Sequence, residues 1–133
     1  MSMIDDTMTE GLSRFLDVDV ARYRLVSANI ANLDTPGYHT RDLDFRSELV
    51  RAGISQAERN SGSFLYASYA SSWAPVVRTV GGLLERPDGN NVSLERESLL
   101  LAETQMKYNL GVQLLKDQFH EISQAINSGG TSS

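Results

Sequence analysis

The chain has 133 residues, of which 41% are hydrophobic and 22% are charged, and this length fits one unit spanning 1–133. Its 12 lysines and arginines against 17 acidic residues give a formal net charge of −5, which argues against nucleic acid or an anionic membrane surface as the main partner. The lack of cysteine excludes disulfides and thiolate metal sites, and no apolar run approaches the roughly 20 residues that span a bilayer.

The first predicted element is a long helix from about Thr9 to Asn32. Its apolar residues recur at steps of three or four, which is helical periodicity. They are Leu12, Phe15, Leu16, Val20, Tyr23, Val26, Ile30 and Leu33. A second apolar set comprises Val18, Ala21, Leu25 and Ala28. We therefore expect a helix with two apolar sides.

The N-terminal region, 1–39, is predicted to end in the turn Thr35–Tyr38. Pro36 disfavours helical backbone at the residue before it. A proline followed by a glycine suits a type II turn in which Gly37 has a positive φ. The side-chain amides of Asn29 and Asn32 can bond the free carbonyls of the helix end or a neighbouring chain, and the sequence leaves both possibilities open.

The middle of the chain, 40–90, is predicted to be an irregular or β-containing segment. Val76–Val80 favours a short strand, and Gly81-Gly82 favours a two-residue turn into Leu83-Leu84. Glycine, serine and asparagine runs predict loops at 60–63 and 69–72, and a turn is predicted at 86–90.

The C-terminal region, 91–133, carries a heptad pattern that predicts a single long helix from Leu94 to about Ile126. The a positions are Leu94, Leu101, Tyr108, Leu115 and Ile122, and the d positions are Ser98, Gln105, Val112, Phe119 and Ile126. Asn91 or Ser93 can cap the start. Because the N-terminal helix is shorter, part of the apolar seam must face another molecule.

No catalytic, cofactor-binding or metal site is predicted. His39 lies near Asp42 and Asp44, but a third ligand is missing from the pattern, so a solvated loop after a turn is the preferred interpretation. The sequence lacks a P-loop, a G-x-G-x-x-G loop and a G-x-S-x-G elbow. We therefore predict a protein that is not an enzyme.

Two stretches, one toward each end, resemble bacterial flagellar rod and hook proteins. The first comprises Ala28–Asn32 and Thr35–Tyr38, and its continuation Arg41–Phe45 is similar to the basal-body proteins of the proximal rod. The second stretch comprises Asn91-Val92, Leu94–Glu97, Leu101–Asn109 and Gln113–Leu115.

The resemblance implies a mainly α protein whose two long terminal helices pair as an antiparallel coiled coil. Copies would stack into a hollow helical tube that serves as a drive shaft and export channel. The implied coiled-coil seam comprises Leu12, Leu16, Tyr23, Val26, Ile30, Leu94, Leu101, Tyr108, Val112, Leu115, Phe119, Ile122 and Ile126. The implied subunit interface comprises Asn29, Ile30, Asn32, Asp34, Thr35, Pro36, Gly37, Tyr38, Arg41, Asp42 and Phe45.

The resemblance also implies partners and a location. The partners would be further copies, other rod proteins, the adaptor at the inner-membrane ring and the flagellar export gate. The chain would be exported without a cleaved signal and would lie in the periplasmic rod of the basal body, with neither a membrane span nor a nucleic-acid partner. The alternative is a soluble helical adaptor or export chaperone, which we expect to be a stable cytoplasmic dimer.

Overall fold

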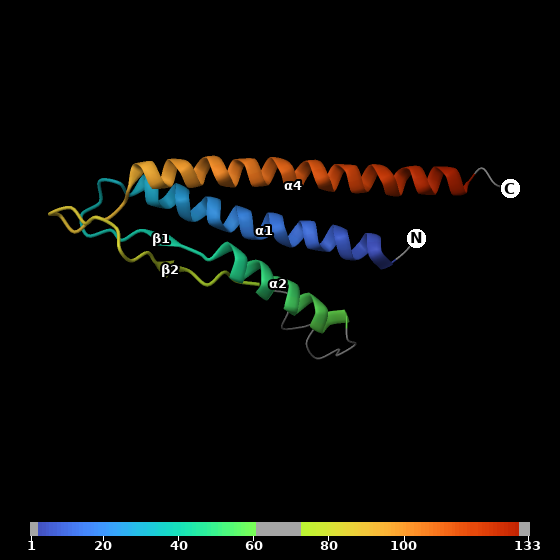
Figure 1. Ribbon diagram of the computed structural model, residues 1–133, viewed down its shortest axis with the longest axis horizontal. Coiled ribbons are helices and arrows are strands. Elements are labelled where there is room, and N and C mark those ends of the chain that lie inside the picture. The colour runs from blue at the N-terminus through green and yellow to red at the C-terminus, as the bar shows by residue number, and fades with distance from the viewer. Residues whose placement is uncertain (1–2, 61–72, 131–133) are drawn as a thin grey trace.

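The computed structural model describes residues 3–60 and 73–130 and is mainly helical, as predicted (Figure 1). In chain order the elements are α1 (Met3–Ala31), β1 (Arg41–Asp42), α2 (Phe45–Asn60), β2 (Arg78–Thr79) and α4 (Leu94–Gly129). Helices α1 and α4 lie side by side and antiparallel, and both chain ends lie at the same end of the molecule. The loop from α1 to β1 and the loop from β2 to α4 gather at the opposite end, and α2 lies on the other side of α1 from α4.

Helix α1 has 29 residues and ends where the sequence predicted. Asn32 continues the helical bonding with its backbone N–H, 3.1 Å from the Ala28 carbonyl, and its side chain donates to the same oxygen at 2.8 Å. The chain then makes the predicted turn, in which the Tyr38 N–H donates to the Thr35 carbonyl at 3.2 Å and Gly37 has φ +73°. These values fit a type II turn.

Helix α4 has 36 residues and begins at the predicted cap, because the Ser93 hydroxyl accepts the Arg96 N–H at 3.3 Å. With 36 residues, α4 is longer than each of the other described elements. Its buried residues are Glu97, Leu100, Thr104 and Gly111. Three of these four follow a seven-residue spacing, and none of them belongs to the predicted a and d sets.

The close approach of α1 and α4 explains a glycine in the middle of α4. A Cβ added to Gly111 would lie 2.7 Å from Leu16 Cδ2 and 3.2 Å from Phe15 Cδ1. Glycine in a helix interior costs about 1 kcal/mol relative to alanine, and here it allows the two helices to come together.

The strand predicted within Val76–Val80 is present as β2. The predicted hairpin, with a turn at Gly81-Gly82 leading into Leu83-Leu84, is wrong, because β2 pairs with a different segment. β2 pairs antiparallel with β1, with Arg41 opposite Thr79 and Asp42 opposite Arg78. The chain after Gly81-Gly82 forms no strand with β2. The pairing ties the segment that follows the turn Thr35–Tyr38, called the signature turn below, to the segment that leads back toward α4.

Helix α2 was not predicted, because its 16 residues carry few large apolar side chains and include an internal glycine. Asp44 caps its start by accepting the Ser47 N–H at 3.3 Å and the Ser47 hydroxyl at 2.9 Å. Phe45 anchors the helix in an edge-to-face contact with Phe15, with ring centroids 5.4 Å apart. The Lys107 ammonium lies 3.9 Å from the Phe45 ring centroid, so the ring contacts both long helices.

Within the described residues the apolar core is small. Its buried members are Val18, Val26, Leu43, Ala52, Val92 and Leu100. Among the described helices none combines the length and the apolar character needed to cross a membrane. Of the predicted loops, 61–63 and 69–72 lie outside the described residues, while Asn60 ends α2.

Candidate functional site

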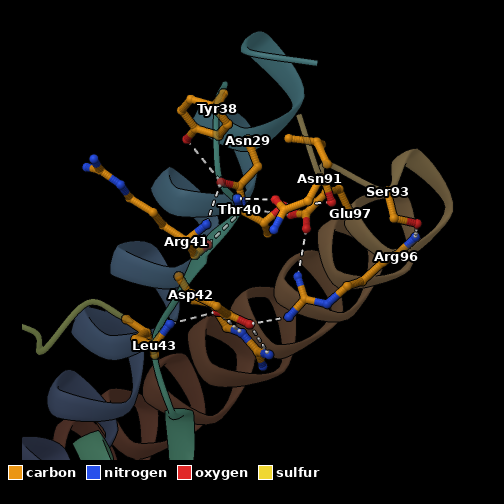
Figure 2. Close-up of polar contacts among 12 residues, drawn as sticks. Asn29, Tyr38, Thr40, Arg41, Asp42, Leu43, Asn91, Ser93, Arg96 and Glu97 are labelled. Atoms are coloured by element: carbon orange, nitrogen blue, oxygen red, sulfur yellow. Dashed lines mark hydrogen bonds and ion pairs between the residues drawn. The ribbon is translucent and has the colours of Figure 1, made fainter. Parts of the chain in front are cut away.

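Five residues form a polar node where the signature turn meets both long helices. The polar node comprises Arg22, Asn29, Asp42, Arg96 and Glu97, and Figure 2 shows most of its contacts. Asn29 and Glu97 are fully buried, and the three other side chains are largely enclosed. Because a buried polar group without a partner is costly, the contacts of these residues explain why they can lie there.

Asn29 uses its full hydrogen-bonding capacity within the chain. Its Nδ2 donates to the Arg41 carbonyl at 2.8 Å and to Glu97 Oε2 at 3.0 Å. Its Oδ1 accepts the Tyr38 hydroxyl and the Arg41 N–H, each at 3.1 Å (Figure 2). An amide side chain has two donor hydrogens and two acceptor lone pairs, so all are occupied. Asn29 therefore holds the chain beyond the turn against α4.

Asp42 connects α1 to α4 through two arginines. Arg22 Nε and Nη2 donate to the two oxygens of Asp42 at 3.1 Å each, in a bidentate pair. Arg96 Nη2 donates to Asp42 Oδ2 at 2.8 Å, and Arg96 Nη1 donates to Glu97 Oε1 at 2.6 Å. The two carboxylates and two guanidiniums thus form a continuous network across three elements.

The charges of the node remain in place because they are paired. Burial opposes ionisation of Asp42, but the hydrogen bonds and charges of Arg22, with further bonds from the Leu43 N–H and Arg96, lower the pKa of Asp42 below its ordinary value. Burial likewise disfavours the charged form of Arg22, but Asp42 raises its pKa above the ordinary value. A charged network of this kind fixes geometry more than it adds stability.

Two asparagines that precede α4, Asn90 and Asn91, bond to the backbone of the chain that follows α1. Asn90 Nδ2 donates to the carbonyls of Asn32 and Thr35 at 3.0 and 2.9 Å, and its Oδ1 accepts the Val92 N–H at 2.8 Å. Asn91 Oδ1 accepts the Thr40 N–H at 2.6 Å. In this pair, called the asparagine lock below, Asn90 donates to carbonyls just after the end of α1, and Asn91 accepts a backbone N–H from the chain that follows the turn.

The two connecting loops contact each other closely at Gly89. The Gly37 N–H donates to the Asp88 carbonyl at 2.9 Å, and Arg86 Nη2 donates to the Leu33 carbonyl. Gly89 has φ +84°, and a Cβ on it would lie 3.3 Å from the Gly37 Cα. A side chain at position 89 would therefore press against the loop that contains Gly37, whereas a Cβ at Gly37 would meet no atom within 4 Å.

The arrangement is suited to rigid positioning. The polar side chains of the node point toward one another and toward backbone groups (Figure 2). Among the residues that the structure describes, no group of three or more histidine, cysteine, aspartate or glutamate side chains could hold a metal ion. The exposed His39 ring contacts the Asn91 amide at 3.4 Å.

The structure divides the predicted interface residues into three groups. Asn29 is fully buried and Asp42 is largely buried, and both have partners within the chain. The half-buried members are Ile30, Asn32, Tyr38 and Phe45. The exposed members are Asp34, Thr35, Pro36, Gly37 and Arg41. Within this last group the side chains of Asp34, Pro36 and Arg41 are exposed for contact with another molecule, whereas the Thr35 hydroxyl donates to Asn32 Oδ1 at 3.1 Å.

The predicted seam residues are also divided. Val26 is buried, and the half-buried members are Leu12, Leu16, Ile30, Leu101, Val112, Leu115 and Ile122. The exposed members are Tyr23, Leu94, Tyr108, Phe119 and Ile126. On α4 the line that faces α1 is displaced from the predicted one, because Glu97, Thr104 and Gly111 occupy positions that apolar residues take in an ordinary seam.

Sequence reasoning missed Arg22, Arg96, Glu97, Asn90 and Asn91 as site residues. Charged residues on a helix normally indicate a solvated face, and helical spacing does not distinguish Arg22 from Arg24. For the residues before and within the start of α4, a signal was available. Asn91, Arg96 and Glu97 fall in the stretch that resembles flagellar rod proteins, and a resemblance over polar residues suggests that they have partners, whereas Asn90 lies just before that stretch.

Comparison with known proteins identifies relatives over most of the chain. The family described as "Flagella basal body rod protein" matches at residues 21–39, which include Arg22, Asn29 and the signature turn. The flagellar basal body rod protein FlgB of Salmonella typhimurium LT2 is 31% identical over 122 residues, or 86% of this chain and 88% of the relative. FlgB of Escherichia coli K12 is 30% identical over 86% of this chain and 88% of the relative. FlgB of Yersinia ruckeri is 29% identical over 90% and 96%.

Proposed function

The chain belongs to the FlgB family of flagellar basal-body rod proteins, and from this premise we propose how its structure serves as a subunit of the proximal rod. The observation that carries the function is the 31% identity to a FlgB protein across 88% of that relative. The role is structural, in the rod of the basal body, and the chain assembles with other rod proteins. The alternative of an adaptor or export chaperone is not favoured, because the relatives are named as rod proteins.

The polar node and the asparagine lock act as a rigid bracket. A rod subunit has to transmit torque, so the loops that contact neighbours must keep a fixed angle to the long helices. Hydrogen bonds from Asn29 and ion pairs at Asp42 supply that angle, because bonded geometry is directional whereas apolar contact is not. The single unit of 1–133 would thus work as a stiff body with a projecting end.

We assign the subunit contacts to the groups that remain exposed. The rim of the signature turn, Asp34, Thr35, Pro36, Gly37 and Arg41, lies at the end where the loops gather. The exposed seam residues Tyr23, Leu94, Tyr108, Phe119 and Ile126 offer apolar surface along the helices. Neighbouring copies would cover this surface, which explains how a chain with a small core gains stability in the rod.

The adaptor at the inner-membrane ring and the export gate are further proposed partners, through the resemblance to rod proteins. The chain would reach them through the flagellar export apparatus. A photoreactive amino acid at exposed Pro36 or Arg41 tests the adaptor contact in living cells. We expect a cross-link to the adaptor or to another rod protein, whereas cross-links confined to cytoplasmic proteins would contradict the assignment.

The function itself is tested by locating the chain. Cells carry an epitope-tagged copy in place of their own, and basal bodies are isolated from them after membrane extraction. We expect the tag in the basal bodies. A tag found only in the cytoplasm, in a stable folded dimer, would support the export chaperone instead.

A further inference from the structure

One buried carboxylate has no partner in the described chain. Asp19 lies on α1 with 1% of its surface exposed, and its Oδ1 makes no hydrogen bond. Its Oδ2 has no hydrogen bond or ion pair with a described residue either. An unpaired buried carboxylate is costly, and native proteins rarely leave one without a partner.

Asp19 lines a groove between α1 and α4 with a volume of about 530 Å³. Two exposed tyrosines, Tyr23 and Tyr108, lie on opposite helices along this groove. The other lining residues are Val20, Arg24, Thr104, Gln105 and Asn109. The groove therefore combines aromatic surface with a carboxylate, which suits a cationic side chain that carries hydrogen-bond donors.

The charges around Asp19 leave it incompletely neutralised. Burial raises the pKa of Asp19 to about 6, against the opposing positive charges of Lys107 and Arg22 and with a smaller contribution from Glu103. Both cations already have other carboxylate partners, since Arg22 binds Asp42 and Lys107 binds Glu103 at 2.9 Å. A donor for Asp19 must therefore come from elsewhere.

A second feature of the same chain offers such donors. Arg41 on β1 and Arg46 at the start of α2 are exposed and form no ion pair within the described chain, and we call them the basic edge. Arg78 on β2 is opposite Asp42 and therefore lies on the other face of the strand pair from Arg41. The Arg41 side chain points away from the polar node (Figure 2). One chain cannot bring the two features together, because β1 binds the side of α1 that carries Arg22 while the groove opens beside Tyr23 and Arg24.

We propose that the groove around Asp19 receives an arginine from the basic edge of a second copy of this chain. The inference rests on the proposed function as a rod subunit. The contact is heterologous, since one copy contributes the groove and the next contributes the edge. Heterologous contacts that do not close into a ring generate open helical assemblies, which is the form a rod requires.

The lack of cysteine makes a direct test possible. Two tagged versions are expressed together in cells that lack their own copy, one with Gln105→Cys at the groove and the other with Thr79→Cys beside Arg41. Basal bodies are then treated with a short bis-maleimide, which can join these cysteines only between copies. We expect a dimer linked through positions 105 and 79. Glu121→Cys, exposed and about 160° around α4 from Gln105, replaces Gln105→Cys as the control and should give no such dimer.

A second measurement tests the role of the carboxylate. Asp19→Asn added to the Gln105→Cys chain should lower the cross-link yield about tenfold, because a charge-assisted bond is lost. Asp17→Asn, an exposed aspartate on the same helix, should leave the yield unchanged. Basal bodies that contain both chains without the 105–79 link, or with position 105 linked to another protein, would overturn the inference alone. Absence of both chains from basal bodies would overturn the proposed function as well.

Discussion

At the scale of single residues, the chain contrasts two buried carboxylates on neighbouring elements. Asp42 receives bonds from two arginines and keeps a lowered pKa, whereas Asp19 lacks a bonded partner and has a raised one. Both side chains are enclosed by α1 and α4, so the presence of hydrogen-bond donors decides the difference. Asp42 therefore fixes the folded geometry, and Asp19 is left available for a contact outside the chain.

The raised pKa of Asp19 predicts a pH dependence of folding. Between its ordinary pKa of 3.8 and the folded value of about 6, the folded chain binds a proton that the unfolded chain does not. The free energy of unfolding should therefore rise as the pH falls from 7 toward 4, by at most about 3 kcal/mol. Urea unfolding followed by circular dichroism, in sucrose to strengthen burial, measures this rise.

Asp19→Asn supplies the matched variant for that measurement. At pH 7 this variant should have a larger free energy of unfolding than the parent chain. Its free energy of unfolding should lack the increase that the parent chain shows as the pH falls from 7 toward 4. Below about pH 4 both chains should weaken, because Asp42 and Glu103, whose pKa values are lowered, then take up protons in the unfolded state first. A parent chain whose stability is flat between pH 7 and 5 would contradict the assignment.

Asn29→Asp tests the polar node at its centre. The substitution keeps the size of the side chain but replaces two donors with a second carboxylate beside Glu97. We expect a loss of about 3 kcal/mol in unfolding free energy, since the new buried carboxylate faces Glu97 and the Arg41 carbonyl with no hydrogen to donate to either. Asn109→Asp, an exposed change on α4, should alter stability by no more than about 0.5 kcal/mol. Equal effects of the two changes in urea unfolding would rule out the role assigned to Asn29.

At the scale of elements, the packing around two helical glycines predicts opposite effects of a leucine substitution on stability. Gly111→Leu should destabilise the chain by about 1–3 kcal/mol, because its Cβ alone would meet Leu16 at 2.7 Å. Gly11→Leu has open space around its Cβ and should stabilise α1 by roughly 0.8 kcal/mol through helix propensity. Thermal unfolding of both variants checks the signs, and a destabilised Gly11→Leu would indicate that packing at this part of α1 has been misread.

The signature turn makes a functional prediction at the same scale. Gly37→Val should strain the turn by about 1–3 kcal/mol, because a β-branched residue is poorly accommodated at φ +73°. We expect reduced swimming in soft agar with little change in the amount of chain expressed. Gly81→Val, which has open space and no positive φ, is the control. Normal swimming of the Gly37 variant would show that the rod tolerates a distorted turn.

At the scale of the whole molecule, the sequence predicted the parts that depend on local patterns. The two long helices, the cap at Ser93 and the turn at Gly37 follow from periodicity, capping chemistry and the Pro-Gly pair. The sequence did not predict which face of α4 packs against α1. Glu97, Thr104 and Gly111 lie on that face, but they are not large apolar residues. They are buried there because of long-range partners and the close approach of the two helices. The polar node depends on contacts between residues as far as 68 positions apart, which no local pattern encodes.

Helix α4 carries a further apolar stripe on a face different from the one that contacts α1. Leu99, Met106 and Leu110 are 70, 72 and 57% exposed, while neighbouring Leu100 is buried. Their spacing of seven and four residues places them on one side of the helix. Exposed apolar side chains in a row are typical of a surface that another molecule covers, and we propose that this molecule is an adjacent subunit of the rod.

Replacing Leu99, Met106 and Leu110 together with glutamine should therefore separate folding from assembly. Because these side chains contribute little to the folded chain, urea unfolding should change by no more than about 0.5 kcal/mol per site. Burial of each leucine or methionine in the rod is worth about 1.5–3 kcal/mol, so the amount of chain in isolated basal bodies should fall sharply and swimming should be lost. The double variant Glu121→Ala, Gln124→Ala, at exposed polar positions of the same helix, should assemble normally. Full incorporation of the triple variant would mean that this side of α4 faces solvent in the rod and that subunits meet only through the groove and the turn.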